Sequence, residues 1–189
     1  MITKRLFSIL ALSPLLLGTA PAWADEYQDT IALFKKAEES GKFFANARGY
    51  AVFPTIGKGG IGIGGAYGKG RVYDRGRVIG ETSMTQLSIG FQLGGQGFSQ
   101  IIFFENADAL NKFTEGEFEF GAEASAVVVT VAAGAKAGSA GATAGASVEQ
   151  GKATMVGVYN NGMAVFTIPK GGLMYEATIA GQKFKFKKR

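Results

Sequence analysis

The chain has 189 residues, 47% of them hydrophobic, and 20 basic and 15 acidic side chains give a formal net charge of +5. It contains 29 glycines but no cysteine and no histidine. These two absences exclude disulfide frameworks, zinc and haem sites that need Cys or His, and Ser-His-Asp or Cys-His nucleophiles. Catalysis by carboxylate, Lys, Ser or Tyr side chains remains open on composition alone.

The N-terminal residues have the three parts of an export signal. Residues 1–5 are short and basic, residues 6–18 are apolar but too few to span a membrane, and residues 22–24 (Ala-Trp-Ala) fit a cleavage motif. We predict cleavage after Ala24, which leaves residues 25–189 as a single domain. The mature protein would be periplasmic or secreted, and could lie peripherally at the inner or outer membrane. A buried N-terminal helix is the alternative.

Residues 27–41 have the periodicity of an amphipathic helix. Tyr27, Ile31 and Phe34 recur at three- and four-residue steps, which places them on one face. The polar face is net acidic, whereas a helix that binds anionic membranes should be basic there. We therefore expect this helix to pack on the domain core.

From Gly49 onward the hydrophobic pattern changes to the two-residue period of strands. Residues 50–53 predict a strand that Pro54 ends, and glycine alternates with apolar residues over 59–70. Such bare backbone favours close approach by another element, a ligand or a sharp bend. Further strands are predicted at 72–79 (a tight hairpin), 85–93, 100–104, 117–120, 124–135, 156–166 (a second hairpin), 173–179 and 183–186.

The remaining elements complete the expected fold class. Asn106 predicts the N-cap of a second helix, which Gly116 would stop. Residues 132–147 are rich in Ala, Gly, Ser and Thr, and we interpret them as extended or flexible. About eight short antiparallel strands, an N-terminal helix and one inserted helix predict an α+β fold whose sheet forms a barrel or a sandwich.

Two motifs match catalytic or cofactor sites in sequence but lack the structural context that such sites require. Gly60-x-Gly62-x-x-Gly65 matches a dinucleotide fingerprint, but the helix start that such a site requires does not follow it. Glu117 and Glu119 share a strand face without the further groups that a catalytic constellation needs. We therefore predict a protein that is not an enzyme, with no catalytic residues, no metal and no cofactor.

Basic residues gather at the C-terminal end of a body that is otherwise near neutral, so we expect no nucleic-acid partner. In a strand, Lys183, Lys185 and Lys187 would share one face. Near an anionic bilayer each basic residue contributes about 1 kcal/mol. The candidate lipid-binding residues are Lys183, Lys185, Lys187, Lys188 and Arg189.

Two structural interpretations compete with lipid contact for these lysines. They could protect an edge strand against aggregation. Alternatively, Lys183 and Lys185 could lie beside Glu117 and Glu119 on a neighbouring strand, with opposite charges as cross-strand neighbours. In that arrangement the lysines would be partly neutralised and would contribute little to binding.

The order of these pieces resembles the SYLF family, also called Ysc84-like, in its exported bacterial form. The similarity covers residues 31–184 through an ordered set of blocks. They are GYAVFP (49–54), GGIGIGGAYGKG (59–70), SIGFQLGGQ (88–96), IIFF (101–104), ADALNKF (107–113), GLM (172–174) and AGQK (180–183). Lys183 lies in the matching closing motif, whereas Ala180 replaces an acidic residue that relatives often carry.

The resemblance implies phospholipid binding, and we expect a non-enzymatic module that associates peripherally with anionic membranes. Some relatives also engage actin through a basic N-terminal region. Because that region is net acidic here, we do not expect an actin partner. The alternative function is a small outer-membrane β-barrel or structural envelope protein, which the length and the number of strands permit.

Overall fold

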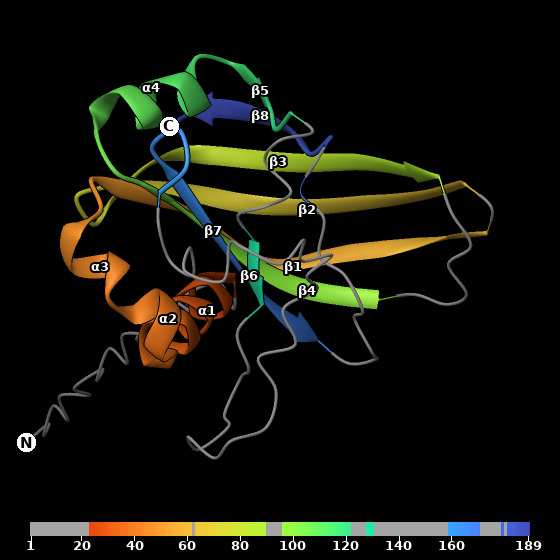
Figure 1. Ribbon diagram of the computed structural model, residues 1–189, viewed down its shortest axis with the longest axis horizontal. Helices are drawn as coiled ribbons and strands as arrows, with labels where there is room; N and C mark the ends of the chain where they lie inside the picture. Colours follow the sequence, from red (N-terminus) through yellow and green to blue (C-terminus); the bar gives the residue numbers. More distant parts are fainter. Residues whose placement is uncertain are drawn as a thin grey trace, which may run out of the picture.

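A computed structural model describes residues 23–61, 63–89, 96–121, 128–130, 159–170, 179 and 181–189 (Figure 1). The elements are α1 (Trp23–Lys36), α2 (Glu38–Gly41), α3 (Phe43–Asn46), β1 (Gly49–Ile61), β2 (Ile63–Asp74), β3 (Arg77–Ile89), β4 (Gln96–Phe104), α4 (Ala107–Thr114), β5 (Glu117–Glu119), β6 (Val128–Thr130), β7 (Met163–Lys170) and β8 (Lys183–Lys188). Among these helices, none is long and apolar enough to cross a bilayer.

The eight strands form one sheet in the order β5-β8-β3-β2-β1-β4-β7-β6. Neighbours are antiparallel except β6, which runs parallel to β7. The predicted α+β class is confirmed. Closure into a barrel is wrong for the described part of the chain, where β5 and β6 are the two edges of an open sheet. The prediction of short strands is wrong for β1, β2 and β3, which have 12 or 13 residues each, and right for β5, β6 and β8, which have 3, 3 and 6.

The long course of β1 depends on a bulge at Pro54, where the sequence predicts a strand end. The pairing register of β1 with β4 shifts between Phe53 and Ile56. A proline in such a bulge removes no ladder hydrogen bond, so the strand continues beyond it. The Pro54 carbonyl accepts a hydrogen bond of 2.6 Å from the Ser99 hydroxyl of β4, which anchors the bulge.

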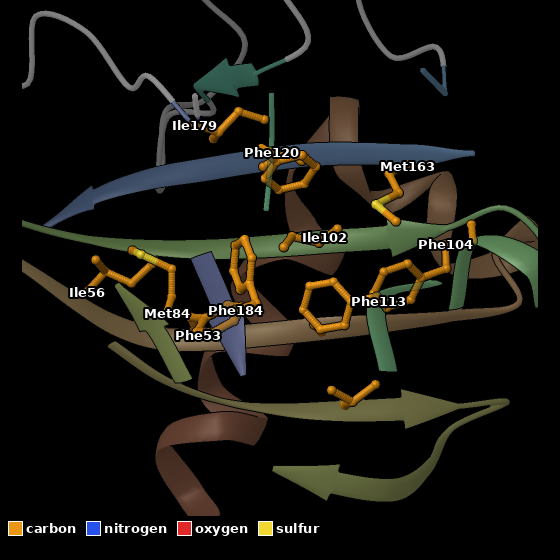
Figure 2. Packing of buried hydrophobic residues seen from close by; sticks show 14 of the residues in the cluster. Phe53, Ile56, Met84, Ile102, Phe104, Phe113, Phe120, Met163, Ile179 and Phe184 are labelled. Carbon is orange, nitrogen blue, oxygen red and sulfur yellow. The ribbon is translucent and has the colours of Figure 1, made fainter. Parts of the chain in front are cut away.

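The sheet curls, so that its inner face encloses much of its own core (Figure 2). The rings of Phe53 on β1 and Phe184 on β8 are 5.6 Å apart, although β2 and β3 separate these strands in the sheet. Gln100 of β4 and Gln182, just before β8, exchange two side-chain hydrogen bonds of 2.9 and 3.2 Å across the same interior. The helix α4 adds Phe113, whose ring lies 5.1 Å from that of Phe184.

The outer face of the sheet is covered by α1, α2 and α3 over β1, β4 and β7. Tyr27, Ile31 and Phe34 are buried there, which confirms the predicted apolar stripe of the first helix. Phe43 of α3 stacks on Phe103 of β4 with ring centroids 5.4 Å apart. The first helix is shorter than predicted at its C-terminal end, since α1 stops at Lys36 and two short helices follow.

Local signals placed the turns and one cap correctly. Arg75 and Gly76 have φ of 49° and 78° in the β2–β3 turn, where asparagine or glycine is usual at such angles. The Asn106 side chain accepts a hydrogen bond of 2.9 Å from the Ala109 backbone, as an N-cap does. The predicted strand segments at 90–93, 124–127, 131–135, 156–158 and 173–178, and the low-complexity segment 132–147, lie outside the described residues.

Candidate functional site

Cationic side chains gather on the outer face of β2, β3 and β8. Residues directly opposite each other in an antiparallel pair point to the same face. Lys69 of β2 is opposite Ser83 of β3, which is opposite Lys185 of β8. The next row aligns Arg71, Glu81 and Lys187 in the same way. We call this surface the cationic face; its members are Lys69, Arg71, Glu81, Ser83, Lys183, Lys185 and Lys187.

The cationic face is hollowed beside α1. An open depression of about 530 Å³ has a lining that includes Tyr27, Tyr67, Lys69, Arg71, Glu81, Ser83, Lys185 and Lys187. Four cationic groups and one carboxylate therefore share one concave surface, which concentrates positive potential there.

Arg71 forms the wall of the depression nearest to α1. Its guanidinium lies over the ring of Tyr27, 4.2 Å from the centroid, in cation–π geometry. Burial raises the pKa of Tyr27, and the charge of Arg71 opposes that rise. The phenol is thus neutral at physiological pH and adds no negative charge to the depression.

The structure brings together three of the five basic residues predicted from the C-terminal end. Lys183, Lys185 and Lys187 are exposed on the cationic face, while Phe184 is buried on the opposite face, which confirms the predicted alternation. Lys188 is opposite Gly80 in the register, on the other face of the sheet, and Arg189 follows the end of β8.

Two of these lysines have glutamate partners on β5. Lys185 Nζ lies 2.8 Å from Glu117 Oε1, and Lys183 Nζ lies 3.3 Å from Glu119 Oε2. The interpretation that competes with lipid contact, in which β5 pairs with β8 and its glutamates partly neutralise these lysines, is therefore confirmed. All four side chains are at least half exposed, and ion pairs of this kind contribute only about 0–1 kcal/mol. The lysines are paired but accessible.

The hydrogen bond to Lys185 also sets the protonation of its partner. It holds the pKa of Glu117 below its usual range, and it raises the pKa of Lys185. Both groups therefore stay charged at neutral pH. Within the described ranges, Lys69 and Lys187 form no ion pair, so the positive charge of the depression is only partly compensated.

Sequence reasoning missed Lys69 and Arg71. The signal that could have found them is their two-residue spacing after Tyr67, which places all three on one face of β2. The glycine motif leads into strand β2, so the helix start that a dinucleotide site requires does not follow it.

A search of curated proteins found no match. A family model described as "Ysc84: Las17-binding protein actin regulator" matches residues 85–188, which is more than half of the chain. The matched segment includes Lys183, Lys185 and Lys187, whereas Lys69 and Arg71 precede it. The chain therefore belongs to the Ysc84 (SYLF) family of binding domains, as its sequence resemblance predicted.

Proposed function

We propose that this protein is a non-enzymatic phospholipid-binding module that associates peripherally with anionic membranes through its cationic face. The observation that carries the proposal is the depression whose described lining holds four cations, Lys69, Arg71, Lys185 and Lys187, and one carboxylate, Glu81, while Glu117 of β5 pairs with Lys185. Membership of a family of binding domains agrees with this role.

The expected strength of the contact follows from the number and spacing of these charges. Lys69 and Lys185 stand two strands apart, which is roughly 10 Å. That separation is close to one Debye length at physiological salt, about 8 Å, so the charges act on one small area of bilayer. At about 1 kcal/mol for each basic residue, four of them give at most a few kcal/mol, which Glu81 and the Lys185–Glu117 ion pair reduce and which salt weakens further.

We also propose that residues 1–24 are removed on export, which would place the domain in the periplasm or outside the cell. The basic, apolar and Ala-Trp-Ala segments of the N-terminus support this. Helix α1 begins at Trp23, so cleavage after Ala24 would shorten it by two residues. Mass spectrometry of the protein recovered from an expressing cell would then show Asp25 at the N-terminus; an intact Met1 would contradict the proposal.

Co-sedimentation with vesicles tests the lipid contact. The vesicles contain phosphatidylcholine alone, or equal amounts of phosphatidylglycerol and phosphatidylcholine. The test variant removes four charges of the depression: Lys69→Gln, Arg71→Gln, Lys185→Gln and Lys187→Gln. The matched control removes four exposed charges from α1, the α2–α3 junction and α4: Lys35→Gln, Lys36→Gln, Lys42→Gln and Lys112→Gln.

We expect the test variant to lose binding to the phosphatidylglycerol vesicles by a factor of about ten or more, while the control keeps most of it. The two variants have the same net charge, so a difference between them reports the position of the charges. Equal losses in both, or equal binding of the wild type to neutral vesicles, would contradict the proposal.

A protein partner is the second candidate, because the matched family is described as Las17-binding and actin-regulating. The α1–α2 region is acidic here, with Glu26, Asp29, Glu38 and Glu39, which does not support an N-terminal basic contact. Co-sedimentation with filamentous actin, using the same two variants, tests this candidate. Binding to actin that the test variant loses and the control keeps would favour it.

A further inference from the structure

Two large apolar side chains project from the same face as the cationic groups. Leu87 of β3 is 86% exposed and Tyr67 of β2 is 51% exposed, whereas the other large hydrophobic residue exposed in the described chain is Leu33 on α1. Leu87 is opposite Gly65, two residues from Tyr67 along β2. The two side chains thus form one small apolar site.

Glycines surround this apolar site on the same face. Gly57 is opposite Tyr67, and Gly59 is opposite Gly65. A Cβ at Gly57 or Gly59 would meet nothing within 4 Å, and at Gly65 it would make only an ordinary contact of 3.6 Å with a backbone oxygen. Neither close packing nor a left-handed backbone requires glycine at these positions. Because these glycines have no side chains, Leu87 and Tyr67 project above the surface that surrounds them.

The apolar site adjoins the cationic face along the same strands: Tyr67 is in the row of Thr85 and Lys183, and Leu87 is two residues further along β3. Tyr67 is two residues from Lys69, and Leu87 is four residues from Ser83, which corresponds to roughly 7 and 13 Å. This end of β2 and β3 points away from α1–α3 (Figure 1). Lysine side chains and the apolar site can therefore meet one bilayer at two different depths.

We propose that the end of β2 and β3 inserts into the membrane interface, with Leu87 among the upper acyl chains and Tyr67 at the headgroup boundary. This inference rests on the proposed function, since the cationic face would contact the phosphates above. Tyrosine favours the interface because its ring is apolar and its hydroxyl is polar. Because the neighbouring cationic face is positively charged, the membrane that it contacts should be anionic. Long lysine side chains can extend toward the headgroups of such a membrane.

The first test compares Leu87→Ser with Leu33→Ser. Both variants remove one exposed leucine, but Leu33 lies on helix α1 and not on the strands that carry the cationic face. We expect Leu87→Ser to lower partitioning into phosphatidylglycerol–phosphatidylcholine vesicles about tenfold, which corresponds to about 1.4 kcal/mol. Leu33→Ser should partition like the wild type. The salt dependence should not change in either variant, because neither removes a charge.

The second test measures depth directly. Trp23 is the single tryptophan of the chain and lies in the segment proposed to be removed, so the mature domain, or the full chain carrying Trp23→Phe, provides a background without indole fluorescence. In that background, the indole introduced by Leu87→Trp should shift to the blue on anionic vesicles and be quenched by lipids brominated on their acyl chains. The indole introduced by Leu33→Trp should show neither effect.

The two proposals fail in different ways. Wild-type binding to anionic vesicles with no loss in Leu87→Ser and no quenching at position 87 would overturn the insertion while leaving the cationic contact intact. Absence of wild-type binding to anionic vesicles would overturn both proposals. Self-association that Leu87→Ser abolishes, without quenching at position 87, would assign the apolar site to a second copy of the chain and would also overturn insertion.

Discussion

The two faces of the β1–β2–β3 region use glycine for different reasons. On the inner face, a Cβ at Gly68 would lie 2.6 Å from Ile56 Cγ1, and one at Gly70 would lie 2.7 Å from the ring of Phe53. On the outer face, a Cβ at Gly57 or Gly59 would meet nothing within 4 Å. The inner glycines let buried side chains approach the backbone. The outer glycines leave no side chains around the exposed Tyr67 and Leu87. One glycine-rich pattern therefore serves both the core and the proposed contact with lipid.

The strand β8 shows the same division between neighbouring residues. Phe184 is 1% exposed and packs against aromatic rings from β1 and α4. Lys185 points to the other face, where its side chain is 72% exposed. Changes on the inner face should therefore lower stability, and changes on the outer face should alter lipid binding with little effect on stability.

The largest expected effect on stability is the difference between substituting Phe184 and substituting its neighbour Lys185. Phe184→Ala should lower the free energy of unfolding by about 3–5 kcal/mol, because it removes a fully buried ring and leaves a cavity. Lys185→Ala should change it by no more than about 0.5 kcal/mol, as an exposed surface substitution does. Urea unfolding followed by circular dichroism measures both. Equal destabilisation by the two substitutions would break the distinction between the faces.

A matched pair of glycine substitutions gives the next largest difference. Gly70→Ala should destabilise the protein by about 1–3 kcal/mol, because the new methyl group meets the buried Phe53 ring and the Val52 carbonyl oxygen at 2.8 Å. Gly57→Ala should be neutral or stabilise by up to about 1 kcal/mol, since it has open space and restricts the unfolded chain. Thermal unfolding of both variants measures the difference. A stable Gly70→Ala protein would show that the inner face is less tightly packed than described.

The smallest expected effect concerns the glutamates beside the cationic face. Glu117→Gln combined with Glu119→Gln should strengthen binding to phosphatidylglycerol vesicles by a few fold, because it removes two negative charges next to Lys183 and Lys185. Each exposed pair contributes little to folding, so stability should change by less than about 1 kcal/mol. Vesicle co-sedimentation at low salt measures the gain. Weaker binding by this variant would indicate that the glutamates help to position the lysines.

The same pair predicts a pH dependence with a defined sign. Because the pKa of Glu117 is lowered, its ion pair stabilises the fold above the ordinary glutamate range and loses that contribution as pH falls through the lowered value. Protonation there also removes a negative charge beside Lys185, so vesicle binding should strengthen as the solution becomes acidic. The Glu117→Gln variant should show a smaller increase, and an equal increase would assign the effect to other groups.

Features set by neighbouring residues could be predicted from the sequence. The alternation of lysine and phenylalanine in β8, the turn at Arg75 and Gly76, and the cap at Asn106 follow from strand periodicity and local backbone preferences. The opposite charges of residues 117–119 and 183–185 were also sufficient to suggest that β5 and β8 are neighbours. Each of these inferences needs only a short segment or a simple charge match.

Features set by distant segments could not be predicted in this way. The course of β1 through Pro54 depends on Ser99 of β4 and on a register shift that no local pattern encodes. Lys69 and Arg71 join the lysines of β8 only because β3 lies between the two strands. Leu87 alternates with polar residues like a core residue, yet its side chain is exposed, since periodicity defines a face but not what covers it.

The most direct test of the central claim is the orientation of the protein on a membrane. The chain has no cysteine, so single fluorescent labels can be attached through Thr85→Cys, on the outer face opposite Lys183, and through Asn111→Cys, at an exposed position of α4. On phosphatidylglycerol vesicles, we predict that the label at position 85 becomes shielded from a water-soluble quencher while the label at position 111 stays accessible. Shielding at position 111 instead, or equal accessibility at both positions in the bound protein, would contradict the account.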